Sequence, residues 1–270
     1  MLTKAGTVKK KLKNAGGVLL LPVLSGVMMA IACRVAGTAL FTGIGTWQLF
    51  FRGLAYVLLL SFGVSINMHT GRFDFSAGAT MLIGGVSGAL IAYGNGWGPA
   101  AMLAVSMLVG CATGLVTGWL YVLLRLPPMI IGLTMTLVLE GVVAIITDGC
   151  KPVGFGTDAI YYRFAVTPGW MLLIMLAALA LMVVLFHYTE FGYDYRALQT
   201  GQRIAVGSGV GEDGNAIGCY AVAGLLFGAA GALSVCSTNG VTPTISFSSI
   251  ASMFSCFLPL FFSGFIIKFC

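Results

Sequence analysis

Charge is scarce in this chain of 270 residues, and that scarcity bounds the class of protein. Only 8 % of the residues are charged, whereas about a quarter are charged in an ordinary soluble domain. Hydrophobic residues make up 59 % of the chain, and the mean hydropathy is +1.00. A chain with so few polar side chains cannot cover a soluble core, so the composition excludes an ordinary soluble domain.

Motifs for catalysis, nucleotide binding and metal binding are also missing from the sequence. It contains no G-x-x-x-x-G-K-[ST] loop, no H-E-x-x-H pair and no G-x-S-x-G turn. The two histidines, His69 and His187, are far apart, and the seven cysteines include no C-x-x-C pair, as expected of small buried residues rather than a zinc or disulfide framework. We therefore expect no enzyme activity, no cofactor and no metal in this chain.

Long apolar runs are what the chain has instead. Runs of 18 or more apolar residues are typical of transmembrane helices, and continuous rather than alternating runs argue against a β-barrel. The sequence therefore predicts an all-α, polytopic transmembrane helical bundle. About eight spans are expected, over residues 17–38, 47–67, 77–93, 98–124, 128–147, 168–187, 215–236 and 250–267.

Positive charge is distributed unevenly along the chain. A basic segment over residues 1–16 carries Lys4, Lys9, Lys10, Lys11 and Lys13. A nucleic-acid arm, a lipid-specific patch and a signal peptide are alternative interpretations of this segment. We interpret it as a cytoplasmic N-terminus followed by a transmembrane domain over 17–270, with the lipid bilayer and no nucleic acid as its partner.

The remaining basic residues support this topology. With the N-terminus inside, the loops over 68–76, 125–127 and 188–214 face inward, and they carry Arg72, Arg125, Arg196 and Arg203. The outward loops carry only Lys151 and Arg163. This asymmetry agrees with the preference of cytoplasmic loops for Lys and Arg.

Glycines recur at four-residue spacing within several of the predicted spans. The repeats are Gly110, Gly114 and Gly118, then Gly84 and Gly88, and finally Gly224 and Gly228. Small residues on one helix face allow close helix packing in lipid, so we expect a tightly packed bundle.

One acidic residue, Glu140, falls within a predicted span. Arg34 and Arg52 lie at a similar depth, toward the outer ends of their own spans. Ionisable groups in membranes are costly, and each needs a partner or a function. Glu140 is therefore expected either to form a structural ion pair with one of these arginines or to face a transported solute.

The stretch that follows the second predicted span is polar and contains flexible backbone. It includes Asn67, Arg72, Phe73, Asp74, Phe75 and Ser76. One interpretation is an inner turn in which Asp74 or Ser76 caps the next helix. The other is a broken helix or re-entrant segment beside a transport pathway, where buried protein or a water-filled cavity satisfies the irregular backbone.

Four stretches in order resemble one protein family. These are TGRFDFSAGATMLIGGVSGAL, LRLPPMIIGLTMTLVLEGVVAIITDG, TEFGYDYRALQTGQRIAVGSGV and AVAGLLFGAAGAL, and the likeness as a whole covers residues from about 50 to 250. They resemble the permease subunits of ATP-binding cassette (ABC) importers of the ribose type and the branched-chain amino acid type, the inner-membrane component of binding-protein-dependent transport.

The resemblance implies a function. The chain would be the permease subunit of a bacterial ABC importer in the inner (cytoplasmic) membrane, moving a small solute, most simply a monosaccharide, by alternating access. Its implied partners are cytoplasmic ABC ATPase subunits, a second permease subunit, identical or different, and an extracytoplasmic solute-binding protein. The inner loop over 188–214 would be the ATPase-coupling segment, with contacts expected from Arg196, Gln199, Gly201 and Arg203.

Several features depart from the family pattern or leave alternatives open. Glu140 stands where the family often has Arg, Thr200-Gly201-Gln202 replaces a G-G-N turn, and the family usually continues for about two more spans. The loop over 188–214 could instead be a solvated connector. An ion-coupled secondary transporter or channel is the main alternative function, and a non-transporting scaffold or membrane enzyme is the other.

Overall fold

The computed structural model describes residues 24, 26–35, 37, 43–156, 159–257 and 260 of the chain. It divides into two compact units, one made of Met1–Leu49 with Phe257–Cys270 and one made of Phe50–Cys256. In the first unit the structure describes a short apolar helix, Gly26–Val35, and the first turns of α2. The second unit contains everything discussed below.

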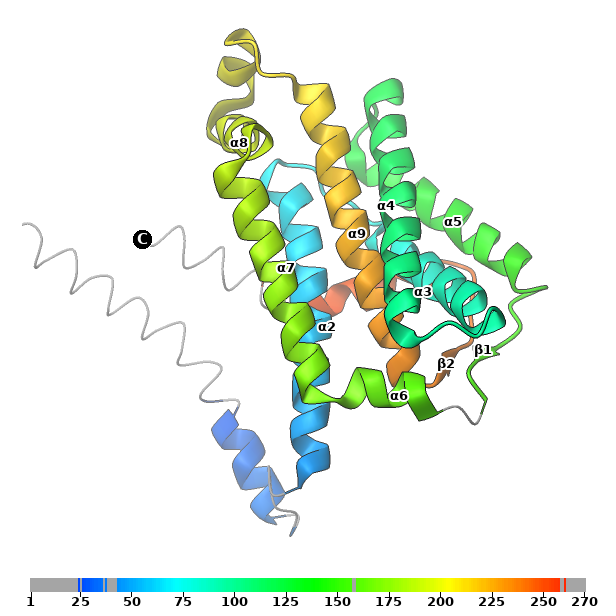
Figure 1. The fold of residues 1–270 in the computed structure, drawn as a ribbon. Helices are drawn as coiled ribbons and strands as arrows, with labels where there is room; N and C mark the ends of the chain where they lie inside the picture. Colours follow the sequence, from blue (N-terminus) through cyan, green and yellow to red (C-terminus); the bar gives the residue numbers. More distant parts are fainter. Residues whose placement is uncertain are drawn as a thin grey trace, which may run out of the picture. The chain divides into compact units, whose positions relative to one another are not determined.

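Six helices are long and apolar enough to cross a membrane among the residues described. They are α2 (Ile44–His69), α3 (Ala77–Gly94), α4 (Pro99–Leu124), α5 (Pro128–Ile146), α7 (Pro168–Tyr188) and α9 (Glu212–Ser237), shown in Figure 1. Each matches a predicted span to within three residues at either end, so the prediction of an all-α polytopic bundle is confirmed. The predicted span over 17–38 and the basic segment 1–16 lie wholly or partly outside the described residues.

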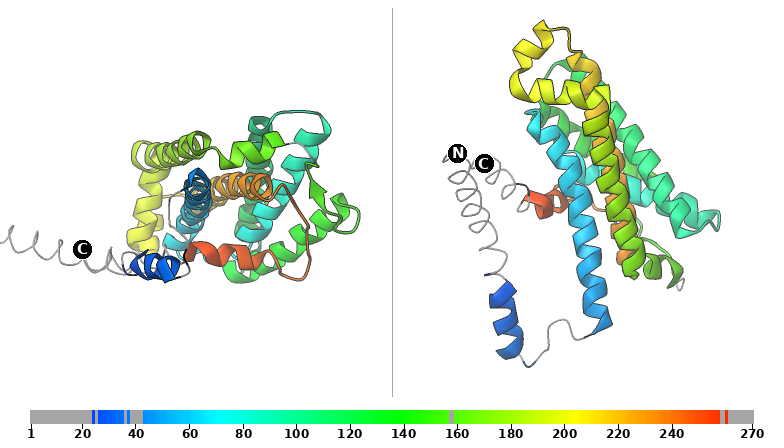
Figure 2. Two further views of the ribbon diagram at one scale, coloured as in Figure 1. Left: turned by 90° about the horizontal axis from the view of Figure 1, so that it is seen from below. Right: turned by 60° about the vertical axis from the view of Figure 1, so that its left-hand side comes forward.

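The predicted span over 250–267 also lies partly outside the described residues. Its described part begins with α10 (Ile250–Met253) and the short 3₁₀ helix η1 (Phe254–Cys256). Figure 2 shows the segment after α9 turning back from the end of that helix to α10, which contacts α3.

Local sequence signals explain where the spanning helices begin and end. Proline occupies the first position of α4, α5 and α7, where its missing N–H costs nothing. Arg125 ends α4 in the left-handed conformation, with φ 51°. The connection of three residues to Pro128 then forces α5 to run back alongside its neighbours.

The core of the second unit is a glycine seam along α9, formed with α3 and α4. A Cβ on Gly224 would lie 2.2 Å from the carbonyl oxygen of Gly110, and one on Gly228 would lie 2.1 Å from that of Ser106. A Cβ on Gly231 would lie 2.1 Å from the carbonyl oxygen of Met81. Only glycine permits backbones this close, so the predicted close packing at four-residue spacing is confirmed.

One end of this unit, which we name the α6 end, is closed by short elements that the sequence did not predict. Strands β1 (Val153–Gly154) and β2 (Gly240–Val241) form an antiparallel pair, and α6 (Ala159–Val166) follows. The rings of Phe155 and Tyr161 stack with centroids 4.2 Å apart. The segment 148–167 is therefore not the plain loop we expected.

The opposite end, the α8 end, carries the remaining helix. Helix α8 (Glu190–Gly207) joins α7 to α9, and the connections 70–76 and 125–127 lie at this end too (Figure 1). All three connections were expected to face the cytoplasm. The described loops therefore alternate between the two ends as the topology requires.

Candidate transport and coupling site

The segment that joins α2 to α3 is a buried, irregular piece of chain rather than an exposed turn. Gly71 has φ +76°, and the backbone N–H of Arg72 bonds the carbonyl oxygen of Asn67 at 2.9 Å. Arg72, Asp74 and Ser76 are only 2 to 7 % exposed. The rings of the intervening phenylalanines, Phe73 and Phe75, meet edge to face, with centroids 4.9 Å apart.

Asp74 fixes the start of α3. Its Oδ1 accepts the backbone N–H of Ser76 at 2.8 Å, and its Oδ2 accepts the Ser76 hydroxyl at 2.9 Å. Ser76 occupies the N-cap position of α3 but makes no side-chain capping bond, and Asp74 orders the turn before the helix through its two bonds to Ser76. Burial raises the pKa of the Asp74 carboxyl, and the bonds from Ser76 oppose that shift.

Helix α5 supports this segment from one side. A Cβ on Gly132 would lie 2.6 Å from the backbone nitrogen of Phe75 and 2.7 Å from Oδ1 of Asp74. The hydroxyl of Thr136, one turn later, donates to the carbonyl oxygen of Phe75 at 3.1 Å. The segment is therefore held against one face of α5.

Arg72 is a buried cation without a carboxylate partner. Its Nη1 donates to the hydroxyl of Thr70 at 3.4 Å, and its guanidinium lies 5.8 Å from the centre of the Tyr121 ring. Across the residues that the structure describes, the one ion pair is between Lys151 and Asp148. Burying a charge without an opposite charge beside it costs free energy. Such residues in membrane proteins typically have a function, so Arg72 is a candidate functional residue.

Two further buried polar groups lie around Arg72. Neither polar atom of the Asn67 amide has a hydrogen-bond partner among the described residues, and the same is true of the Tyr220 hydroxyl. The rings of Tyr121 and Tyr220 lie 5.8 Å apart. The end of α2, the end of α4 and the start of α9 therefore share a polar interior at the α8 end.

Glu140 lies elsewhere and does not pair with Arg52, one of the two arginines that we named as its possible partners. It is 2 % exposed, and its carboxylate accepts the backbone N–H of Phe247 at 2.9 Å and that of Ser249 at 3.0 Å. Arg52 instead donates to the carbonyl oxygen of Ser237 at 3.4 Å. The pairing with Arg52 was therefore wrong, because backbone N–H groups, which the residue types alone do not reveal, satisfy the acid.

The predicted pathway residues are linked through α5 rather than gathered at one point. Gly132, Thr136 and Glu140 follow one another at four-residue spacing, so they share one face of the helix. The first two contact the segment over 67–76, and Glu140 contacts the segment over 247–249. The four-residue spacing was readable in the sequence, but its partners were not.

Helix α8 has one buried face and one exposed face. Gly192, Tyr195, Leu198 and Ala205 are buried, whereas Arg196, Gln199 and Arg203 are exposed. Gly201 is half-buried and adopts an extended backbone (φ 178°, ψ 94°) that divides α8 into two helical parts. The inner loop predicted over 188–214 thus contains a helix with a kink in its middle.

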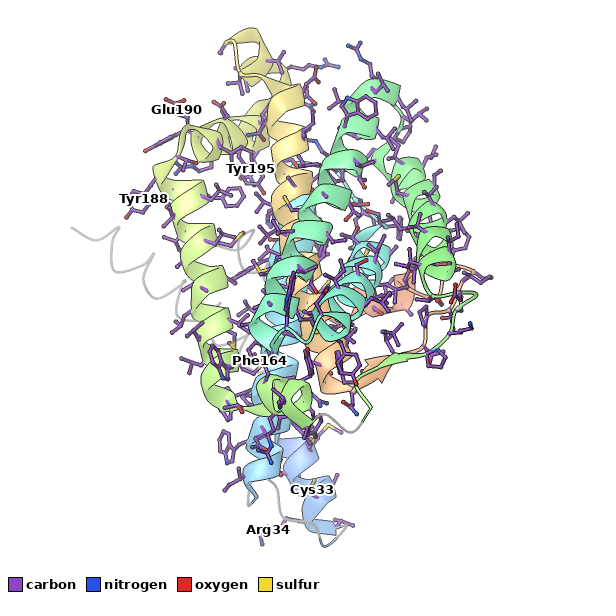
Figure 3. All side chains as sticks on the ribbon, turned by 45° about the vertical axis from the view of Figure 1, so that its right-hand side comes forward. Cys33, Arg34, Phe164, Tyr188, Glu190 and Tyr195 are labelled. Atoms are coloured by element: carbon purple, nitrogen blue, oxygen red, sulfur yellow. The ribbon has the colours of Figure 1, made fainter. Side chains whose placement is uncertain are left out.

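The buried face of α8 is anchored to three spanning helices. The Tyr195 hydroxyl donates to the carbonyl oxygen of Ile66 in α2 at 2.9 Å, and the Tyr195 ring meets that of Phe186 in α7 at 4.6 Å. The amide of Asn215 in α9 donates to the carbonyl oxygen of Phe191 at 3.2 Å. Figure 3 shows Tyr195 on the inner side of α8, while Glu190 and Tyr188 mark its junction with α7.

The exposed face of α8 carries Arg196 and Arg203 among polar, acidic and apolar side chains. The guanidinium of Arg196 lies 4.7 Å from the centre of the Tyr193 ring, which orients it along the helix surface. Nearby Gln202 donates to a carboxylate oxygen of Glu212 and ties the second half of α8 to the start of α9. The four residues predicted to contact an ATPase therefore lie on one element at the α8 end.

Comparison with known proteins identifies the family. The sequence model described as "Branched-chain amino acid transport system / permease component" matches residues 48–265. The chain belongs to this permease family. It is accordingly a multi-pass inner-membrane protein of the ABC importer permease class, as the six apolar helices of spanning length among its described residues also indicate.

Individual relatives are similar over about two thirds of this chain. The ribose import permease protein RbsC of Escherichia coli (strain K12) is 28 % identical over 196 residues, which are 69 % of this chain and 60 % of that protein. RbsC of Bacillus subtilis (strain 168) is 26 % identical over 194 residues, 69 % of this chain and 59 % of that protein.

A third relative imports a different solute. The autoinducer 2 import system permease protein LsrC of Yersinia pestis (strain Pestoides F) is 26 % identical over 191 residues, 69 % of this chain and 53 % of that protein. This chain thus spans about 60 % or less of the length of these relatives. No solved structure matches.

Proposed function

We propose that this chain is the membrane-spanning subunit of a bacterial ABC importer that moves a small solute by alternating access. A separate ATPase subunit supplies the energy, and the chain itself performs no chemistry. The observation that carries the proposal is α8, a kinked helix at the end expected to be cytoplasmic, with one anchored face and one exposed face that carries two arginines.

The contacts of α8 suit the transmission of motion. Its buried face is bonded to α2 and α9, whereas Arg196, Gln199 and Arg203 are left for a partner. An amphipathic helix that lies in a groove of a partner is a common mode of recognition, and rigid helices transmit a rigid-body shift. Movement of an ATPase against the exposed face would therefore reach α2 and α9, two of the three helices that border the buried polar interior.

The buried interior at the α8 end is the proposed hinge beside the pathway. Asn67, Arg72 and the segment up to Ser76 combine buried polar groups with irregular backbone, which is stable in a membrane only inside protein or beside a cavity. Asp74 holds this break in place through Ser76. Glu140 and the segment that it binds are proposed to border the pathway from the opposite side.

The proposed solute is a monosaccharide, and the proposed partners follow from the importer class. The names of the relatives specify ribose and autoinducer 2, and the ribose permeases support a sugar for this chain. The partners are two cytoplasmic ATPase subunits, a second permease subunit and an extracytoplasmic solute-binding protein.

Uptake in cells with and without ATP tests the proposal. Radiolabelled D-ribose, D-xylose and D-glucose would each be supplied to cells that express the chain with its neighbouring ATPase and binding-protein genes. We expect uptake to stop when ATP is depleted and to survive a protonophore for as long as ATP is maintained. Uptake that collapses with the proton gradient while ATP remains high would favour the ion-coupled alternative, and no change on deletion of the gene would favour a scaffold.

A further inference from the structure

A cavity of about 180 Å³ lies beside the start of α3 and the last turns of α9. The segment over 242–249, between β2 and α10, forms much of its remaining wall. Half of the residues that line it carry hydroxyl groups: Ser234, Thr242, Thr244, Ser248, Ser249 and Ser252. The other lining residues are glycine, aliphatic residues and methionine, and none of the described lining residues is ionisable.

This lining defines a class of ligand. The hydroxyls of Thr244, Ser248 and Ser249 already donate within the protein, to the Ser248 hydroxyl, to the Thr244 carbonyl oxygen and to Glu140 respectively. Their oxygens keep lone pairs that can accept from the hydroxyls of a neutral solute. The lining offers a charged ligand no countercharge that would compensate for the hydration it loses on binding. Apolar side chains such as Met81 and Val235 suit the C–H face of a sugar ring. The volume lies below the range of roughly 300–1,000 Å³ that is typical of drug-sized ligands, so a single ring fits better than a chain of sugars.

Glu140 holds the hydroxyl-bearing wall in position. Beyond its bonds to the backbone N–H groups of Phe247 and Ser249, it accepts the Ser249 hydroxyl at 2.6 Å. A carboxylate is an acceptor without any donor, so it can satisfy three donors that converge on it. No other side chain of this size offers that combination.

The wall is also constrained from its other sides. Ser246 and Phe247 have φ of 76° and 63°, conformations that residues other than glycine adopt only when surrounding contacts impose them. The carbonyl oxygen of Ser249 lies 2.0 Å from the position that a Cβ on Gly78 would occupy, so α3 presses directly on the same segment. A strained segment clamped between α5 and α3 keeps a fixed shape, as a binding site requires.

We propose that this cavity binds a neutral, polyhydroxylated solute the size of one sugar ring, and that Glu140 is the positioning residue of its hydroxyl wall. The inference rests on the proposed function, because it gives the imported solute a place within this chain. The site would not bind a charged solute, so it differs from a site for amino acids or phosphorylated sugars.

Protection of single cysteines from a thiol reagent tests the site. Thr242→Cys and Ser248→Cys place a thiol in the lining, and Thr238→Cys, at the exposed end of α9 outside the lining, is the matched control. The purified full chain in mild detergent would be treated with a water-soluble methanethiosulfonate, and labelling of the unsubstituted chain would be subtracted. D-Ribose, D-xylose and D-glucose are the probes, and D-ribose 5-phosphate and L-leucine are the charged comparisons.

The expected result is that at least one neutral sugar slows labelling at Thr242→Cys and Ser248→Cys but not at Thr238→Cys. The slowing equals one plus the ratio of sugar concentration to Kd, so it reaches about tenfold at roughly nine times Kd. Failure of all three sugars to protect, or equal protection by either charged comparison, would overturn the assignment.

The role of Glu140 is tested in the Ser248→Cys background. Glu140→Gln keeps the shape but places an amide N–H against a backbone N–H, so we expect the half-protecting sugar concentration to rise about tenfold or more. Glu140→Asp keeps an acceptor-only carboxylate and should restore part of the affinity. Unchanged protection in a monodisperse Glu140→Gln protein would overturn the positioning role.

This test and the test of the proposed function fail in different ways. ATP-dependent sugar uptake without protection would overturn the cavity as the site and leave the importer proposal standing. Protection without any ATP-dependent uptake would support the site and count against the importer proposal.

Discussion

The glycine seam makes the sharpest prediction about stability, because the backbones of α4 and α9 leave no room for a methyl group. In Gly224→Ala the new Cβ would lie 2.2 Å from the carbonyl oxygen of Gly110 and 3.0 Å from Cα of Gly114. These are backbone atoms, so the two helices must separate by roughly 1 Å. A gap of that size forfeits a quarter to a half of each dispersion contact along the seam.

The size of the effect follows from opposing terms. Overpacking a well-packed core costs about 1–3 kcal/mol, and alanine returns up to about 1 kcal/mol of helix propensity. With the lost dispersion added, we expect Gly224→Ala to lower the free energy of unfolding by about 1–2 kcal/mol. That corresponds to roughly a 5- to 30-fold change in the unfolding constant.

A matched control isolates the close approach from the glycine-to-alanine change itself. A Cβ on Gly53, in the interior of α2, meets nothing within 4 Å. Gly53→Ala should therefore leave stability unchanged or raise it by up to about 1 kcal/mol. The assay is titration of the purified chain in mild detergent with sodium dodecyl sulfate, followed by circular dichroism. If Gly224→Ala unfolds at the same point as Gly53→Ala, the argument for a backbone seam is refuted.

Two further substitutions test the α8 end by the same titration. Folding raises the pKa of Asp74 above the ordinary value of about 3.9. Above about pH 4 the folded chain therefore holds a proton that the unfolded chain has lost. The contribution of Asp74 to the free energy of unfolding then declines as the pH rises. Asp74→Asn keeps an acceptor for Ser76 but does not titrate. The free energy of unfolding of the wild type, minus that of the variant, should therefore fall as the pH rises above about 4. A difference that does not change with pH would contradict the burial of this acid. Tyr195→Phe removes the hydrogen bond to Ile66 and should lower the free energy of unfolding by about 0.5–1.5 kcal/mol. We expect it to slow solute uptake and to leave ATPase binding intact. Unchanged uptake would contradict a role for that contact in transmitting motion.

The spanning helices were predictable because the length of an apolar run directly reports a membrane crossing. Pro99, Pro128 and Pro168 stand at the first positions of three spanning helices, and the four-residue glycine spacing predicted the close packing of the seam. Strands β1 and β2 have two residues each, too short to leave a pattern. Helix α6 has only eight residues, and its Tyr161 packs against Tyr93, which is distant in the chain.

The site was harder to predict, since its partners come from tertiary packing. The polarity of the segment over 67–76 was visible, but its support by Gly132 and Thr136 required the position of α5. For Glu140 the sequence favoured an arginine, because unlike charges attract. The acid instead satisfies two backbone N–H groups and one hydroxyl, which no charge pattern could reveal. The hydroxyls of 242–252 carried no signal at all until the fold brought them to one cavity.

The central claim is that the exposed face of α8 engages an ATPase, and co-purification tests it most directly. The tagged full chain would be isolated in mild detergent from cells that express its neighbouring genes, and bound proteins would be identified by mass spectrometry. We predict recovery of a protein with a phosphate-binding loop, its loss when Arg196 and Arg203 are both changed to Glu, and its retention in Arg163→Glu, which reverses a charge at the α6 end. A well-folded wild-type chain that recovers no such ATPase, or equal recovery by all three proteins, would contradict the account.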